Sequence, residues 1–269
     1  IEVNYQDFRN ASGESIEVGD GASINANTGS VAFDRTVYPV PYGSVSGTQF
    51  LEHATAGTAD LAQGDVIVHV RVTDADYNVS AQGEDSITDA NVTLNIERGS
   101  SVQFLATLGN TTSGGAAYDA LTNDGKMLEV SPDSGVFEYD QTVTFTSGPT
   151  TDCPSAFSAG CILQGDIITV EYADNNDASG KPQTVTDSAT FDLRNGVLQS
   201  DKSVYLIGSD MILTLIEPDF DLDNDGAQSV PLNLIEWDSD AATTTLNGNA
   251  VGGDSSANAA AFDPEPSEL

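Results

Sequence analysis

The sequence of 269 residues predicts an all-β protein made of tandem β-sandwich domains with mostly antiparallel strands. Short runs in which apolar and polar residues alternate recur along the chain, and clusters of Gly, Asn, Asp and Ser separate them. No stretch keeps a helical period of 3.6 residues with capping residues at its ends. A long internal repeat is the third observation, and it predicts several copies of one structural unit.

The repeat is visible as a direct alignment of the chain with itself. Ile1–Val40 aligns with Ile168–Ile207 without a gap, and 14 of the 40 positions are identical. We therefore expect the chain to begin inside a repeat unit. The predicted divisions are the C-terminal strands of a preceding unit, one complete unit, and the N-terminal part of the next unit with an acidic, Pro-containing tail: 1–30, 31–196 and 197–269.

Six runs carry the strand pattern, which places apolar side chains on one face and polar side chains on the other. They are Val66–Val72, Val92–Ile96, Val136–Phe145, Ile167–Tyr172, Thr184–Leu193 and Met211–Ile216. The complete unit, 31–196, exceeds the roughly 100 residues of one immunoglobulin-like sandwich. Each immunoglobulin-like unit is therefore predicted either to have two lobes, with a boundary near 109–125, or to carry insertions such as Gly43–Gln63.

The charge is strongly negative, with 42 acidic residues, 8 basic residues and a net charge of −34. Such a surface repels phosphates, which excludes nucleic acids as partners, and attracts small cations. A halophile's solvated surface and plain solubility are alternative explanations. The excess of Asp over Glu favours ligation of hard cations. No apolar run approaches the length of a membrane span, so we expect no membrane insertion by this segment.

Two Asp-rich segments are candidate sites for a structural Ca²⁺ or another divalent cation. Residues 221–226 match the first six positions of an EF-hand loop, although Leu232 replaces the Glu expected at the twelfth. A second segment begins at Asp74. When Asp74 is aligned with Asp219, every candidate ligand position of the first segment is matched by a residue with an oxygen-bearing side chain. The alternative is that both are Asp-rich turns whose carboxylates cap backbone amides. The predicted ligands are Asp219, Asp221, Asp223, Asp225, Asp74, Asp76 and Asn78.

Covalent features favour an extracellular location. The only two cysteines, Cys153 and Cys161, are close in sequence and predict a disulfide within a hairpin; two reduced thiols are the alternative. Four N-x-S/T sequons are candidate glycosylation sites. They lie at Asn10, Asn78, Asn91 and Asn110.

No catalytic residues are predicted, and we expect a protein that is not an enzyme. A Ser-His-Asp triad would need His53 or His69 as its base. His53 lies in the expected insertion, whereas His69 is on the polar face of a strand, where an ordinary exposed imidazole is expected. Phosphate-binding glycine loops and nucleophile elbows are absent from the sequence.

Five segments of the sequence carry a likeness to a known family: Asp34–Pro41, Gly165–Tyr172, Thr186–Gly196, Ser203–Asp210 and Glu217–Asp225. These segments resemble the S-layer proteins of ammonia-oxidising archaea (Thaumarchaeota). The resemblance implies a secreted cell-surface protein whose tandem immunoglobulin-like domains assemble with copies of themselves into an acidic, glycosylated, cation-dependent lattice. A secreted adhesin or pilus-type binding module with calcium-stabilised sandwich repeats is the alternative. A carbohydrate-binding accessory domain would need an aromatic platform that the sequence does not indicate.

Overall fold

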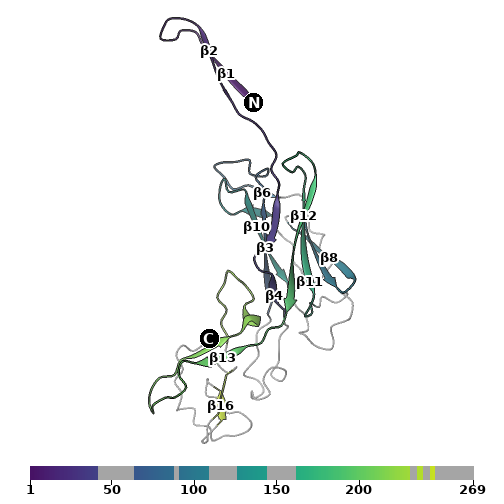
Figure 1. The fold of residues 1–269 in the computed structure, drawn as a ribbon, viewed down its shortest axis with the longest axis vertical. Coiled ribbons are helices and arrows are strands. Elements are labelled where there is room, and N and C mark those ends of the chain that lie inside the picture. The colour runs from purple at the N-terminus through teal and green to yellow at the C-terminus, as the bar shows by residue number, and fades with distance from the viewer. Residues whose placement is uncertain are drawn as a thin grey trace.

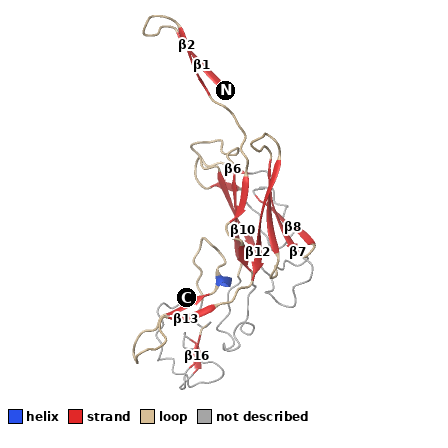
Figure 2. Ribbon diagram, in the orientation of Figure 1, coloured by secondary structure: helices blue, strands red, loops and turns tan. Residues whose placement is uncertain are grey.

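The computed structural model confirms the all-β fold (Figures 1 and 2). It describes residues 1–41, 64–87, 91–108, 126–143, 162–230, 235–238 and 243–245. Within these ranges, the one helical element is the short 3₁₀ turn η2 (Pro218–Phe220). No helix in the described ranges is long and apolar enough to cross a membrane. The expected boundary near 109–125 and the expected insertion Gly43–Gln63 lie outside them.

Ten strands form two five-stranded sheets, which we call the central sandwich. The first sheet has the order β3 (Ser30–Phe33), β5 (Val66–Thr73), β10 (Val136–Val143), β9 (Met127–Glu129), β6 (Ser86–Ile87). The second has the order β4 (Val37–Pro39), β12 (Gln183–Asp192), β11 (Ile167–Asp174), β7 (Val92–Arg98), β8 (Ser101–Leu108). The described pairings are antiparallel except that of β4 with β12. Figure 2 shows the two layers side by side.

The core lies between the sheets and follows the alternation of each strand. Strand β5 buries its four valines completely, and β7 does the same with Val92, Leu94 and Ile96. Strand β11 contributes Ile168 and Tyr172 from the opposite sheet. Because residues of both sheets belong to one contiguous apolar cluster, the two faces stabilise each other.

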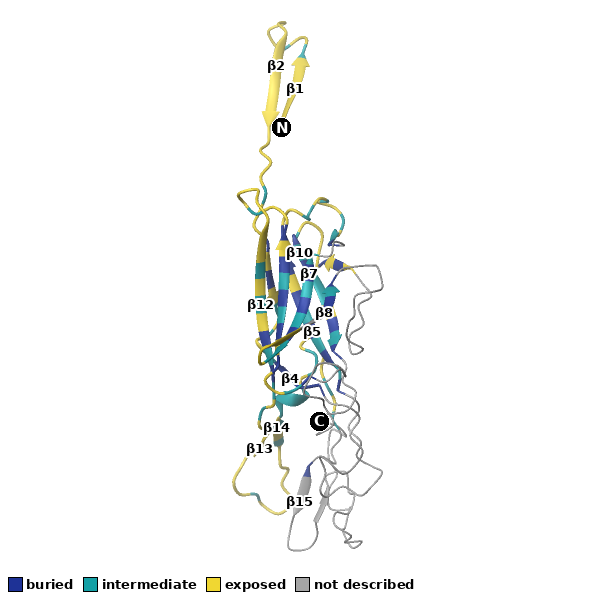
Figure 3. Ribbon diagram, turned by 90° about the vertical axis from the view of Figure 1, so that its right-hand side faces the viewer, coloured by how far each residue is buried: buried dark blue, intermediate teal, exposed yellow. Residues whose placement is uncertain are grey.

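Short hairpins lie beyond both ends of the central sandwich (Figure 1). One hairpin, β1 (Glu2–Asp7) with β2 (Ile16–Gly21), extends from one end, and its side chains are almost all exposed (Figure 3). The other end carries β13 (Val197–Ser200) paired with β14 (Leu213–Ile216). A third pair is β15 (Glu236–Asp238) with β16 (Thr243–Thr245).

The sequence repeat that aligns Ile1 with Ile168 is also a repeat of strand register. Glu2 pairs with Gly21 in β1–β2, and the residues aligned with them, Thr169 and Ser188, pair in β11–β12. The β1–β2 hairpin is therefore equivalent to β11–β12. Likewise, β13 is equivalent to β3, since the aligned residues Ser30 and Val197 begin the two strands.

A five-residue motif, Asp-basic-x-x-Tyr, has the same local structure in both copies, Asp34–Tyr38 and Asp201–Tyr205. In each, the Tyr hydroxyl donates a hydrogen bond to the Asp carboxylate. The basic side chain lies over the Tyr ring, 5.2 Å from the centroid in the first copy and 5.4 Å in the second. The bonds from Tyr205 and from a backbone N–H lower the pKa of Asp201 to about 2.

A buried ion pair joins β7 to the loop before β11. Asp166 is almost fully buried and accepts hydrogen bonds from Arg98 Nε at 2.7 Å and from the second guanidinium nitrogen at 2.5 Å. It also accepts the backbone N–H of Leu163 at 2.8 Å. Removing only the guanidinium would leave a buried carboxylate without its countercharge.

We expect Arg98→Met to lower the free energy of unfolding by about 3–5 kcal/mol, the usual cost of an uncompensated buried charge. Urea denaturation followed by circular dichroism measures this loss. Arg71→Met is the matched control, because the Arg71–Glu138 pair is solvent-exposed and should contribute only about 0–1 kcal/mol. Equal losses in the two variants would contradict the prediction.

Glu129 organises the turn between β9 and β10. Its carboxylate accepts the backbone N–H groups of Asp85 at 2.9 Å, and of Ser134 and Gly135 at 2.8 Å each. The N–H of Asp85, with those of Gly135 and Ser134, outweighs the effect of burial and lowers the pKa of Glu129.

A lowered pKa means that the charged Glu129 stabilises the fold above the unfolded pKa of about 4.3, and that this contribution is lost as the pH falls through the folded pKa. We expect Glu129→Gln to be less stable at pH 7 and to lose less stability on acidification. Urea midpoints at pH 7 and across the acid range measure both effects. Parallel curves for wild type and variant would contradict the assignment.

Candidate functional site

The Asp-rich segment after β14 forms a compact loop, Glu217–Gly226, which we call the acidic loop. Glu217 accepts the backbone N–H of Asp219 at 3.2 Å, at the start of η2. Asp223 accepts the N–H of Asp225 at 3.0 Å, and the N–H of Gly226 donates to the carbonyl of Asp223 at 3.3 Å. The loop is therefore shaped by its own carboxylates and backbone.

The four candidate ligand carboxylates of this loop contact protein groups at three different places. Asp219 accepts the backbone N–H of Arg194 at 3.0 Å, and Asp221 lies 3.3 Å from the Arg35 guanidinium. The Asp223 carboxylate lies 3.0 Å from Nε2 of His69, and the Asp225 carboxylate lies 4.0 Å from Nδ1 of the same ring. Nowhere in the described ranges do three or more His, Cys, Asp or Glu side chains form a group that could hold a metal ion. The Ca²⁺ site stays a prediction.

These contacts dock the acidic loop on the central sandwich. The N–H of Ile67 in β5 donates to the carbonyl of Leu222 at 2.9 Å, and the Leu222 side chain packs against the core. Arg35 adds a hydrogen bond to the carbonyl of Asp221 at 2.9 Å. One apolar contact surrounded by polar contacts thus attaches the following unit to the sandwich.

His69 lies between carboxylates of two units. Its Nδ1 is 2.7 Å from Asp140 on β10, and its Nε2 is 3.0 Å from Asp223 in the acidic loop. Burial disfavours the charged ring, but the two hydrogen bonds and the charges of Asp140 and Asp34 outweigh it and raise the pKa of His69. The side chain is only 12 % exposed, so the expectation of an ordinary exposed imidazole is wrong.

The second candidate segment follows β5 and contains a buried carboxylate. Asp74 accepts the Tyr172 hydroxyl and the backbone N–H of Asp76, the latter at 2.8 Å. Burial is the largest cause of its raised pKa. Asp76 accepts both the backbone N–H and the side-chain amide of Asn27, at 2.9 and 2.8 Å. Asn78 donates to Asp133 at 3.1 Å, so its amide is directed toward the β9–β10 turn.

The expected alignment of Asp74 with Asp219 is wrong, because the structure aligns Asp74 with Glu217 and Asp76 with Asp219. Three pairs of equivalent contacts fix this frame. The first is a strand pairing: Ser30 pairs with Thr73 in one copy, and Val197 pairs with Ile216 in the other. The second is a backbone hydrogen bond, from Asp34 to His69 and from Asp201 to Ile212. The third is a backbone N–H donated to a carboxylate, from Asn27 to Asp76 and from Arg194 to Asp219. The two loops are therefore equivalent, but two positions away from the frame that their Asp spacing suggests.

The sequence contains a signal for this corrected frame. It aligns Tyr77 with Phe220 and Gly83 with Gly226, and both glycines end a tight turn. The alternating strands before the loops carried no such information, because a shift of two residues keeps every side chain on the same face. Large aromatic residues and glycines, rather than Asp spacing, identify the equivalent positions.

The described glycosylation candidates differ in surroundings. Asn10 is partly buried at the β1–β2 turn, where its side-chain carbonyl accepts the N–H groups of Ser12 and Glu14. The amide of Asn91 donates to the Tyr77 hydroxyl at 2.9 Å. Asn110, Cys153 and Cys161 lie outside the described residues, so that sequon and the disulfide stay predictions.

Comparison with known proteins finds no family model that matches this chain, and no curated protein matches it.

We expect Leu222→Asp to release the acidic loop, because a charge at this partly buried position opposes the apolar contact with the core. The backbone N–H of Ile67 should then exchange with solvent about tenfold faster or more, corresponding to about 1.4 kcal/mol. Amide hydrogen exchange resolved by residue measures it. Leu206→Asp, at a highly exposed position, is the control. Unchanged protection at Ile67 in Leu222→Asp would contradict the docking.

Proposed function

We propose that this chain is a structural segment of a self-assembling, acidic, cation-dependent two-dimensional lattice at an archaeal cell surface, an S-layer. The observation that carries the proposal is the serial arrangement of equivalent elements. A hairpin equivalent to β11–β12 precedes the central sandwich, and a strand pair equivalent to β3–β5 follows it. Tandem sandwich units are suited to extended, load-bearing assemblies.

The contact between units supports a structural role. In both copies, the chain that leaves the last hairpin of one unit donates a backbone N–H to a carboxylate in a loop of the next unit. After β1–β2 the donor is Asn27 and the acceptor is Asp76, and after β11–β12 the donor is Arg194 and the acceptor is Asp219. At the second position, the acidic loop also docks on the preceding sandwich through Leu222. Repeated contacts of this kind restrict the rotation of one unit relative to the next.

The charge supports dependence on cations. Five of the eight basic side chains form ion pairs within the described residues, and 42 acidic residues are distributed along the chain. Neighbouring copies in a lattice would repel one another unless counter-cations accumulate between them. Divalent cations bound by surface Asp residues, whether or not they occupy the acidic loop, would supply this neutralisation.

A non-catalytic role fits the polar residues that would otherwise be candidates for chemistry. His69 is held from both ring nitrogens by carboxylates and contributes to the attachment of the acidic loop. The buried Asp74 is engaged by Tyr172 and by its own turn. These residues therefore have structural tasks that account for their positions.

The test is assembly. Negative-stain electron microscopy of the chelated protein, before and after addition of calcium, should show ordered sheets only with calcium. Sodium chloride at matched ionic strength is the control for charge screening, and magnesium tests ion preference. A chain that remains monomeric or forms filaments under all conditions would contradict the lattice and favour the adhesin or pilus-type alternative.

A further inference from the structure

The β1–β2 hairpin exposes a sheet face that is a core face elsewhere in the same molecule. Val3 and Tyr5 are 69 % and 67 % exposed, whereas their equivalents in β11, Val170 and Tyr172, are fully buried. The strand registers are identical, so the same side chains share the same face. A two-stranded hairpin with an uncovered apolar face is marginally stable in water. The central sandwich shows directly what covers such a face.

In the central sandwich, Tyr172 fits a specific site formed by β5, the loop after it and the residue before β3. Its ring lies against Gly29, where an added Cβ would come within 2.5 Å of Cε1. Its hydroxyl donates to Asp74. Tyr77 and Val72 belong to the surrounding core. The aromatic side chain therefore requires a glycine, a carboxylate and an apolar wall.

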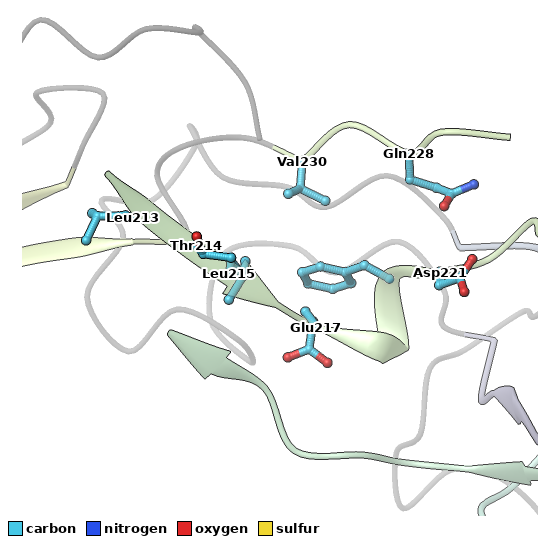
Figure 4. A pocket seen from close by; sticks show the side chains of 8 residues that line it. Leu213, Thr214, Leu215, Glu217, Asp221, Gln228 and Val230 are labelled. Atoms are coloured by element: carbon cyan, nitrogen blue, oxygen red, sulfur yellow. The ribbon is translucent and has the colours of Figure 1, made fainter. Parts of the chain in front are cut away.

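The same site, without its tyrosine, lies at the other end of the chain. An open cavity of about 410 Å³ is lined by side chains of β14 and of the acidic loop (Figure 4). Its lining includes Leu213, Leu215, Glu217, Phe220 and Val230. In the frame that aligns Asp74 with Glu217, these five are equivalent to Val70, Val72, Asp74, Tyr77 and Ile87, which enclose the core of the complete sandwich.

The glycine is present as well. Gly196 is equivalent to Gly29 in the alignment that pairs Ser30 with Val197, and it lies against Glu217 as Gly29 lies against Asp74. An added Cβ at Gly196 would come 2.2 Å from a carboxylate oxygen of Glu217. The cavity lining supplies the hydrogen-bond acceptor and the apolar wall, and Gly196 beside Glu217 supplies the small residue, so the three elements that hold Tyr172 are found together here.

We propose that the β1–β2 hairpin of one copy of this chain docks on the β13–β14 pair of a second copy, with Tyr5 inserted in the cavity lined by Leu215, Glu217 and Phe220. The Tyr5 hydroxyl donates to Glu217, as Tyr172 donates to Asp74. Since donor and acceptor faces lie on different parts of the chain, the contact is heterologous and propagates head to tail. The contact depends only on the apolar faces of the β1–β2 hairpin and the β13–β14 pair. It goes beyond the proposed function, because it can form whether or not the chain assembles into a lattice.

The first experiment is sedimentation velocity over a range of protein concentrations, with a chelator to prevent sheet formation and about 0.5 M salt to screen the net charge. We expect the wild-type mass to rise with concentration. Tyr5→Ala should weaken association at least about tenfold, because a buried aromatic anchor is lost, and Tyr5→Phe should weaken it less because only the hydrogen bond is lost. Phe8→Ala is the matched control: Phe8 is an exposed aromatic residue at the turn after β1.

The second experiment is complementation. Tyr5→Ala removes the donor and Leu215→Asp removes the acceptor, so each variant alone should stay monomeric at concentrations where the wild type associates. An equimolar mixture should form a 1:1 dimer and nothing larger, because each variant retains one intact half. Amide protection of β5 and β11 in the central sandwich reports whether each variant remains folded.

Two outcomes would overturn the contact. If Tyr5→Ala associates like wild type, another surface mediates the assembly. If wild type is monomeric at every concentration, other residues cover the hairpin face and a second copy does not. Calcium-induced sheets are scored separately by microscopy, so failure of this contact in the sedimentation experiment would leave the proposed function standing.

Discussion

The structure depends on the burial of one face of each sheet against the other, with tyrosine hydroxyls satisfied at the edge of that core. Tyr172 shows the constraint most clearly, because its ring needs the absence of a side chain at Gly29 and its hydroxyl needs the carboxylate of Asp74. Gly29 lies directly before β3 and Asp74 directly after β5, so completing the core also fixes the start of the unit. The linker before β3 is positioned by the same loop, through Asn27 and Asp76. Packing within a unit and connection between units are consequently parts of one arrangement.

The acidity of the chain has an internal role besides its effect on the surface. Carboxylates accept backbone N–H groups at turns, as Glu129 does between β9 and β10, and Asp166 balances the charge of Arg98 inside the sandwich. Asp is suited to this task because its short side chain reaches nearby amides without a large loss of conformational freedom. Part of the unusual composition therefore reflects the many turns of an all-β chain, and only the remaining exposed carboxylates are available to cations.

The alternation of apolar residues predicted five strands of the sandwich (β5, β7, β10, β11 and β12) and the apolar face of β5, whereas the other five strands, β3, β4, β6, β8 and β9, were not among the predicted runs. It was insufficient to align the two Asp-rich loops, because a strand looks the same after a shift of two residues. The burial of His69 was also beyond prediction, since its partners Asp140 and Asp223 are 71 and 154 residues away in the chain. Local pattern reveals which face of a strand is apolar. Which loop lies over that face is decided by contacts distant in sequence.

The alignment that pairs Tyr38 with Tyr205 does not continue into the next strand, where Thr73 is equivalent to Ile216. The stretch from Tyr38 to Val70 is much longer than the matching stretch from Tyr205 to Leu213, while the contacts on both sides of it are kept. Within the stretches that the two copies share, the difference in length therefore lies in the connection between the Asp-basic-x-x-Tyr motif and the following strand. A modular chain of this kind can acquire new surface at that connection in one unit without altering how successive units are joined, which permits neighbouring units to diverge in what they display.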